Sequence, residues 1–463
     1  MNYKQIEEYI LNIPKFRKEG SIEQTRKFYE FLGKPGKNGA MVHVAGTNGK
    51  GSTCAYMDSV LTEAGYKVGM FTSPHLVSIR ERMRINQELI SEEDFTNCFQ
   101  ELMNCIEKYN DNSDKNEYRI INRNISRNFN EDINKNLVHA IIEGKGKTEQ
   151  EECYLPTFYE FLFFMAMLYF EEQNADIIIL ETGLGGRLDA TNVIDAPKVA
   201  VITEIGKDHM EYLGDTFEQI AEEKAGIIKS GSSVVYSGNR QETARVIERK
   251  AKDEGVLCKC VEKLGKQDYR FVDKKIDFSF LSRYYGYIPI TLNTSAVYQI
   301  ENAKVALTAL EVLELNISQE AMQNGIEKCK WEGRMEEILP GIYLDGAHNE
   351  DGIEAFISSV KMDECRGKRW LLFSAVADKE YKNMKDKLID SGLFSYVYAA
   401  PLKNIRGISK EELENITSDL EVRISDSTCE GLQEIISLKK ENDFVYVTGS
   451  LYLVGEIKGT FER

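Results

Sequence analysis

The chain has 463 residues, enough for two or three domains that each bury their own core. Its formal net charge of −17 excludes a non-specific binder of nucleic acid or anionic membranes, because most of the surface would repel a polyanion. Nine cysteines without a CxxC pair predict reduced thiols, and residues 1–11 lack the apolar core of a secretory signal, so we expect a cytoplasmic protein.

The first predicted strand, residues 41–45, runs into a glycine-rich turn and then a helix. Glycines allow backbone N–H groups to approach phosphate oxygens, Lys50 adds a point charge, and the Ser52 hydroxyl can reach Mg²⁺. In the ordinary Walker motif no glycine separates the lysine from the hydroxyl residue. The pattern still predicts a nucleoside triphosphate cradle, formed by Gly46, Thr47, Asn48, Gly49, Lys50, Gly51 and Ser52. His43, inside the strand, is expected to be structural.

Helix and strand patterns then alternate along the chain, apart from an asparagine-rich stretch at residues 110–152 that reads as a solvated insertion. The predicted strands of this part are residues 68–71, 176–180, 199–202 and 234–236. The predicted helices are residues 92–109, 157–173, 217–228, 299–313 and 318–328. Such alternation implies a parallel sheet covered by helices, and short β-like runs at residues 269–292 suggest an antiparallel edge.

A second βα series follows, with strands near residues 342–344, 370–374, 396–399 and 444–447. We therefore expect an α/β protein with a P-loop ATPase domain, residues 1–330, built on a mostly parallel sheet. A smaller Rossmann-like α/β domain, residues 331–463, would complete a nucleotide cleft.

Polar loops follow three of the predicted strands, at residues 72–76, 181–192 and 203–214. Ligands bind at the carboxyl ends of strands in open α/β sheets, so these loops are candidates for recognition. Arg187 could hold a substrate carboxylate with two parallel hydrogen bonds. Glu160 begins an aromatic helix, where it is either a metal ligand or a carboxylate that favours the helix dipole.

The phosphate turn and these loops resemble, in order, the folylpolyglutamate synthase and dihydrofolate synthase branch of the Mur ligase superfamily, over residues 41–456. The resemblance implies an ATP-dependent ligase that adds L-glutamate to reduced folate and to dihydropteroate through an acyl phosphate. It implies ATP, two Mg²⁺ ions, a monovalent cation as a further candidate, no nucleic-acid or membrane partner, and a monomer. The motifs do not separate one glutamate addition from the other.

The resemblance also assigns roles to single residues. The candidate catalytic residues are Lys50, Lys224, His209 and Arg334, with Lys224 a candidate for carbamylation by CO₂. Nucleotide contacts beyond the turn are Asn302, Arg334, Asp345 and His348. The candidate metal ligands are Ser52, Ser73, Glu160 and His209. The candidate substrate contacts are Thr72, Pro74, His75, Arg82, Arg187 and Asp189. Replacing Lys50 or Glu160 by alanine is expected to abolish ligation.

Two positions depart from the family pattern. Tyr298 replaces a histidine beside the adenine site, and Gln87 replaces a glycine in a turn. Three alternatives stay open at this point: a Mur-type ligase of UDP-linked muropeptides, a P-loop NTPase that makes no amide, and a non-catalytic paralogue that binds folate. The Thr-Ser-Pro-His loop argues against the first, and the intact charged positions argue against the last.

Overall fold

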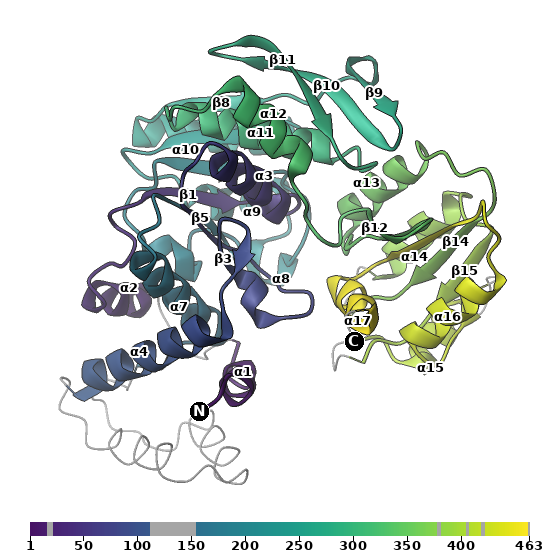
Figure 1. Cartoon of the computed structure of the whole chain (residues 1–463), viewed down its shortest axis with the longest axis horizontal. Coiled ribbons are helices and arrows are strands. Elements are labelled where there is room, and N and C mark those ends of the chain that lie inside the picture. Colours follow the sequence, from purple (N-terminus) through teal and green to yellow (C-terminus); the bar gives the residue numbers. More distant parts are fainter. Residues whose placement is uncertain (16–21, 112–153, 377–380, 404–406, 418–421, 462–463) are drawn as a thin grey trace. The chain divides into compact units, whose positions relative to one another are not determined.

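The computed structural model describes residues 1–15, 22–111, 154–376, 381–403, 407–417 and 422–461 (Figure 1). The chain divides into two compact units, the first made of residues 1–38 and 91–173 and the second of residues 39–90 and 174–463. The predicted insertion, except for its first two residues, lies outside the described ranges.

The first unit is helical. Its described helices are α1 (Tyr3–Leu11), α2 (Ile22–Phe31), α4 (Glu92–Asp111) and α7 (Phe158–Glu172). An aromatic core joins them, with Phe28 of α2 edge-on to Phe164 of α7 at 5.0 Å between ring centroids. Asn110 was expected to begin the insertion, but it lies buried in the last turn of α4. Its amide exchanges hydrogen bonds of 3.0 and 2.9 Å with the backbone of Tyr154.

The second unit contains the predicted parallel sheet. Its strands are β1 (Ala40–Ala45), β2 (Val68–Phe71), β3 (Met83–Ile85), β4 (Glu88–Leu89), β5 (Ile177–Glu181), β6 (Val199–Ile202), β7 (Ser233–Ser237) and β8 (Cys258–Val261). Their order in the sheet is β4-β3-β2-β5-β1-β6-β7-β8. The six strands β2, β5, β1, β6, β7 and β8 pair in parallel, whereas β3 and β4 form an antiparallel hairpin at the edge next to β2. The central strands are buried on both sides, which explains their continuous apolar runs.

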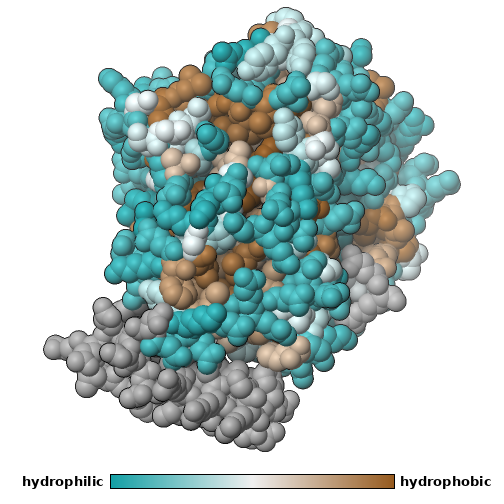
Figure 2. Space-filling model, turned by 60° about the vertical axis from the view of Figure 1, so that its left-hand side comes forward, coloured by the Kyte–Doolittle hydropathy of each residue, from teal (hydrophilic) through white to brown (hydrophobic). Residues whose placement is uncertain are grey.

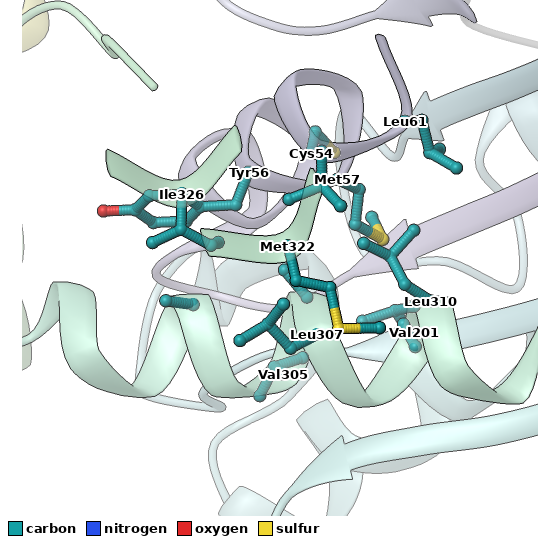
Figure 3. Packing of buried hydrophobic residues seen from close by; sticks show 14 of the residues in the cluster. Cys54, Tyr56, Met57, Leu61, Val201, Val305, Leu307, Leu310, Met322 and Ile326 are labelled. Carbon is teal, nitrogen blue, oxygen red and sulfur yellow. The ribbon is translucent and has the colours of Figure 1, made fainter. Parts of the chain in front are cut away.

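Helices cover both faces of this sheet. One face packs against α3 (Lys50–Glu63), α11 (Gln299–Val312) and α12 (Gln319–Lys328), whose side chains meet in the cluster of Figure 3. The other face packs against α9 (Phe217–Ala225) and α10 (Gln241–Glu254). A single helical turn, α8 (Met210–Leu213), precedes α9. Helix α9 ends three residues before the predicted end at residue 228.

The β-like runs at residues 269–292 form a sheet of their own, so the expectation of an edge on the main sheet was wrong. The strands are β9 (Tyr269–Val272), β10 (Lys275–Ser282) and β11 (Gly286–Leu292), all antiparallel. Their alternating burial gives one face to the core around α11 and α12. A half-buried antiparallel sheet needs only this one covered face.

A second α/β layer follows residue 335. Its strands are β12 (Glu336–Leu339), β13 (Ile342–Leu344), β14 (Arg369–Phe373), β15 (Tyr396–Ala399), β16 (Val422–Ile424) and β17 (Phe444–Thr448), in the order β12-β13-β17-β14-β15-β16. Its helices are α13 (Glu350–Val360), α14 (Tyr381–Asp390), α15 (Lys410–Thr417), α16 (Thr428–Leu438) and α17 (Leu451–Phe461). Leu371 and Phe373 face the core with α13 and α14, whereas Trp370 and Leu372 face the core with α16 and α17.

Two mostly parallel sheets, each with helices on both faces, confirm the predicted α/β class. Both sheets belong to the second compact unit, and the proposed domain boundary at residue 331 stays a prediction. Hydrophilic side chains cover most of the face drawn in Figure 2, with hydrophobic ones gathered in separate patches. Among the described helices, none combines the length and apolar character needed to cross a membrane.

Candidate active site

The predicted phosphate turn is a strand-turn-helix in the structure. Gly49 has a φ of +84° and immediately precedes α3, so the turn needs a residue without a side chain at this point. The N–H groups of Thr47 and Asn48 donate to Glu204 O at 2.8 and 3.2 Å, which fixes the loop on the segment after β6. Lys50 Nζ donates to Thr47 O at 3.2 Å. The lysine and the N-terminus of α3 therefore lie at the same point, as a triphosphate cradle requires.

Lys224 of α9 lies under this cradle. Its side chain is buried, and Nζ donates to Gly46 O at 2.8 Å. Burial, with the nearby charge of Lys50, lowers the Lys224 pKa to about 7. A lysine with this pKa is partly neutral near pH 7, and only the neutral amine can react with CO₂. The resemblance-based assignment of Lys224 as a carbamylated residue therefore has a chemical basis here.

Glu181, the last residue of β5, was not selected from the sequence as a site residue. It pairs in register with Val44, two residues before the phosphate turn, and its carboxylate is buried. Burial raises its pKa, while Lys50 and Arg334 act in the opposite direction. Its carboxylate also accepts the N–H of Ser73 at 2.9 Å. The available signal was its place between an apolar strand and a glycine-rich loop.

The loop after β2 contains the predicted substrate contacts. The Ser73–Pro74 peptide is cis, and Thr72 N donates to Arg82 O at 3.1 Å. Arg82 is buried, and its Nε donates to His75 Nδ1 at 2.8 Å. The structure thus brings together Thr72, Ser73, Pro74, His75 and Arg82.

Glu81, which was not selected from the sequence as a site residue, organises the same loop. Its carboxylate accepts the N–H groups of Leu76, Val77 and Ser78 at 2.6 to 2.8 Å. The turn that carries Gln87 keeps a left-handed conformation, with φ of 71°, so the glycine-to-glutamine departure does not remove this backbone geometry.

Asp208 stands between two of the predicted histidines. Its carboxylate lies 3.8 Å from His209 Nε2 and 3.9 Å from His348 Nε2. Burial alone would raise the Asp208 pKa, but the two histidines together with Lys50 and Lys224 hold it below its ordinary value. His209 itself is exposed and left-handed, with φ of 51°. Asp208, which was not selected from the sequence as a site residue, therefore lies between the two histidines of this cluster.

The glycine-rich loop after β5 is held from within by Asp189. Its carboxylate accepts the backbone N–H groups of Gly183 and Leu184 at 2.8 and 2.9 Å. It also accepts the backbone N–H of Thr191 at 3.0 Å and the Thr191 hydroxyl at 2.5 Å. Asp189 is therefore a loop-organising residue in this structure. Arg187 donates through Nε and an Nη nitrogen to the Glu223 carboxylate at 3.2 and 2.9 Å. Its guanidinium therefore already pairs with a carboxylate of the protein itself.

The start of α11 lies directly against the cradle. Gln299 donates to the Ser52 hydroxyl at 3.1 Å and accepts from Asn302 at 2.9 Å. The Asn302 amide oxygen stands where a side chain at Gly49 would extend. The structure thus places Asn302 beside the phosphate turn, next to Ser52.

The second sheet contributes Asp345 and Arg334. Asp345 is buried and accepts the Tyr298 hydroxyl at 2.5 Å, Met335 N at 3.0 Å and Ala347 N at 2.9 Å. Tyr298, which stands in place of the family's histidine, directs its hydroxyl to this carboxylate. Arg334 donates to Gly333 O at 3.0 Å.

Glu160 belongs to the other compact unit. It accepts the Thr25 hydroxyl at 2.5 Å and Thr157 N at 2.6 Å, and Thr157 in turn caps the start of α7. Its carboxylate therefore has local partners, and its predicted role in metal binding stays a prediction.

Mg²⁺ fits the chemistry of the cradle. Within the described ranges, no group of three or more His, Cys, Asp or Glu side chains could hold a metal ion by itself. Magnesium in nucleotide sites takes only one or two protein oxygens, with phosphate oxygens and water completing its shell. The hydroxyl of Ser52 and the carboxylates of Glu181 and Asp208 supply such oxygens, each beside or within the electrostatic reach of Lys50.

Curated relatives of the chain extend over almost its full length. It is 33% identical to the dihydrofolate synthase/folylpolyglutamate synthase of Bacillus subtilis, over 98% of each chain. It is 28% identical to the folylpolyglutamate synthase of Lacticaseibacillus casei, over 99% of each chain.

Solved structures agree with these relatives. A folylpolyglutamate synthase in complex with AMPPCP and folate matches with a TM-score of 0.79 and 27% identity, over 100% of both chains. Escherichia coli FolC in complex with DHPP and ADP matches with a TM-score of 0.77 and 26% identity, over 100% of this chain and 98% of that one.

The fold and the site define an ATP-dependent ligase of the Mur type, and residues 157–310 match the model of the Mur ligase middle domain. The chain belongs to the dihydrofolate synthase/folylpolyglutamate synthase family. The resemblance identified from the motifs is thereby confirmed, and the muropeptide ligase and plain NTPase readings lose their support.

Proposed function

We propose that this chain joins L-glutamate, through an ATP-driven amide bond, both to dihydropteroate and to reduced folate. The observation that carries the proposal is the convergence of Lys50, Glu181, Lys224 and Arg334 at the carboxyl ends of β1 and β5. Cations for phosphate oxygens and a carboxylate for a metal meet there at one site. The relatives whose names contain both activities support the choice of substrates.

In the first step a substrate carboxylate attacks the γ-phosphorus of ATP, the bond to the β-phosphate oxygen breaks, and ADP leaves. Lys50 and the N-terminus of α3 would hold the β- and γ-phosphates, and Arg334 would reach the same charge from the second sheet. Mg²⁺ bound by Ser52 and Glu181 would supply further neutralisation of the phosphate charge.

In the second step the amine of glutamate attacks the carbonyl carbon of the acyl phosphate. The tetrahedral intermediate then expels inorganic phosphate, loses a proton from nitrogen, and leaves the amide. Water would hydrolyse the same acyl phosphate, so the loop that carries Thr72 and His75 has to position the folate carboxyl away from bulk solvent.

The test is product mass after incubation with ATP, Mg²⁺ and glutamate, with dihydropteroate in one tube and reduced folate in another. Addition of one glutamate in both tubes is expected. Addition in one tube only would limit the chain to that activity, and ATP hydrolysis without any glutamate adduct would overturn the proposal. The monomeric state and the cytoplasmic location expected from the sequence stay predictions.

A further inference from the structure

Gly51 of the phosphate turn is in direct contact with Trp331, a residue that has no role in the site described so far. Gly51 is the glycine that separates Lys50 from Ser52 in the phosphate turn. A Cβ added at Gly51 would lie 2.8 Å from Trp331 Cζ2 and 3.1 Å from its Nε1. The indole therefore rests on the backbone of the first turn of α3, and the unusual glycine is required because the ring occupies the space of a side chain.

Arg84 covers the same indole from another segment. Its guanidinium carbon lies 5.3 Å from the centroid of the Trp331 ring, within the range of a cation–π contact. Arg84 belongs to β3, which follows the substrate loop and pairs with β2 through Met70. Asp58 of α3 is buried, and the Arg84 charge acts on it. Trp331 thus joins α3 to the hairpin behind the substrate loop.

The position of Trp331 in the chain gives this contact its consequence. It lies three residues after the end of α12 and three residues before Arg334, the proposed phosphate contact. Gly333, between them, has a φ of +65° and accepts the N–H of Gly346 at 2.8 Å, so it is already attached to the second sheet. Only Glu332 lies between Trp331 and Gly333; this residue is exposed, and its carboxylate pairs with Lys458 of α17 at 3.0 Å.

We propose that Trp331 is a positioning residue of the ligation reaction: its indole, held between Gly51 and Arg84, fixes the connection so that Arg334 reaches the phosphate cradle. This inference rests on the proposed function, because it assigns Arg334 to ATP. Loss of the ring would let Arg334 move relative to Lys50, and a displacement of about 1 Å can cost about a hundredfold in rate.

The first experiment uses fluorescence, because Trp331 and Trp370 are the chain's only tryptophans. In the Trp370→Phe variant, titration with the ATP analogue AMPPCP should change the Trp331 emission saturably, with the same dissociation constant that calorimetry gives. The matched Trp331→Phe variant retains Trp370, which stacks on Tyr396 at 4.0 Å in the second sheet, and its emission should stay constant. Constant Trp331 emission at calorimetric saturation would overturn the inference. Absence of AMPPCP binding by calorimetry would instead overturn the proposed function.

The second experiment is a double-mutant cycle on ligation kinetics. Trp331→Ala should lower kcat about tenfold, and Trp331→Phe should restore most of it, since a flat ring still fits between Gly51 and Arg84. Gly51→Ala should raise the KM for ATP strongly in the wild-type background and much less in the Trp331→Ala background, because the clash is with the indole. Equal effects of Gly51→Ala in both backgrounds would assign the glycine to phosphate alone and overturn the inference.

Discussion

Two of the buried glutamates lie in contrasting surroundings, one at the start of α7 and one at the end of β5. Glu160 accepts hydrogen bonds from Thr25 and Thr157 within its own compact unit. The Glu181 carboxylate accepts the N–H of Ser73, and the charges of Lys50, Arg334 and Arg82 act on it. Burial alone therefore does not mark a functional carboxylate. Hydrogen bonds within its own unit offset the cost of burying the Glu160 carboxylate, whereas the cations around Glu181 favour the charged form that a bound Mg²⁺ would require.

The largest expected effect is that of Glu181→Gln. The neutral amide keeps the size of the side chain but removes the charge that faces Lys50 and would hold Mg²⁺, so kcat for ligation should fall about a hundredfold or more. Steady-state kinetics at saturating ATP would measure this loss, with circular dichroism as the control for folding. Wild-type turnover in Glu181→Gln would contradict the proposed difference between the two glutamates, because the charge of Glu181 would then have no role in ligation.

Lys224 offers the next test, since its pKa of about 7 lies far below the usual lysine value. Above pH 7 the amine is mostly neutral and can form a carbamate, whereas below pH 7 it is mostly protonated. Bicarbonate added to CO₂-depleted enzyme should therefore raise the rate of ligation several-fold at pH 8. The activation should be much weaker at pH 6, because the neutral fraction of the amine is about tenfold smaller there than at pH 8. Bicarbonate activation that is equally strong at pH 6 would contradict this assignment. Lys224→Arg should show no activation at any pH.

Glu160→Ala tests the other buried glutamate. Loss of the reciprocal cap at the start of α7 should cost about 1–2 kcal/mol of unfolding free energy. Ligation should fall much less than in Glu181→Gln, although the family resemblance led us to expect that this substitution abolishes it. Thr157→Ala provides the matched control, because Thr157 and Glu160 form the two halves of the same cap. The losses of unfolding free energy in the two single variants should therefore not add up in the double variant. Complete loss of ligation at unchanged stability would restore Glu160 as a metal ligand.

The smallest effect concerns His43, a second buried group that is hydrogen-bonded within the fold. Its Nε2 lies 2.7 Å from the Thr191 hydroxyl, and burial lowers its pKa from 6.5 to about 3. Between pH 6.5 and about 3 the imidazole binds a proton in the unfolded chain but not in the folded chain. The free energy of unfolding therefore has its full value above pH 6.5 and decreases as the pH falls toward 3. Denaturant unfolding of His43→Gln should therefore lose up to about 1.4 kcal/mol less per pH unit in this window than wild type. Parallel pH profiles of the two proteins would exclude this linkage.

The order of the elements and the loops that carry the chemistry could be predicted from the amino-acid sequence alone. Apolar runs such as that of β5 gave the parallel strands, because strands buried on both faces have no polar alternation. The spacing from Gly46 to Ser52 predicted the cradle, because close approach to phosphate requires glycines within a few residues of the lysine. These features are local, and local patterns can be read in one dimension.

Which polar residues lie close together became evident only in the folded structure. Glu181 reaches Lys50 through the pairing of β5 with β1, more than a hundred residues apart in sequence, and Asp345 reaches Tyr298 from the other sheet. The β-hairpins of residues 269–292 likewise formed a separate sheet, because strand pairing depends on which partners are available in space. Contacts of this kind depend on chain topology, and the type of a residue does not reveal its distant neighbour.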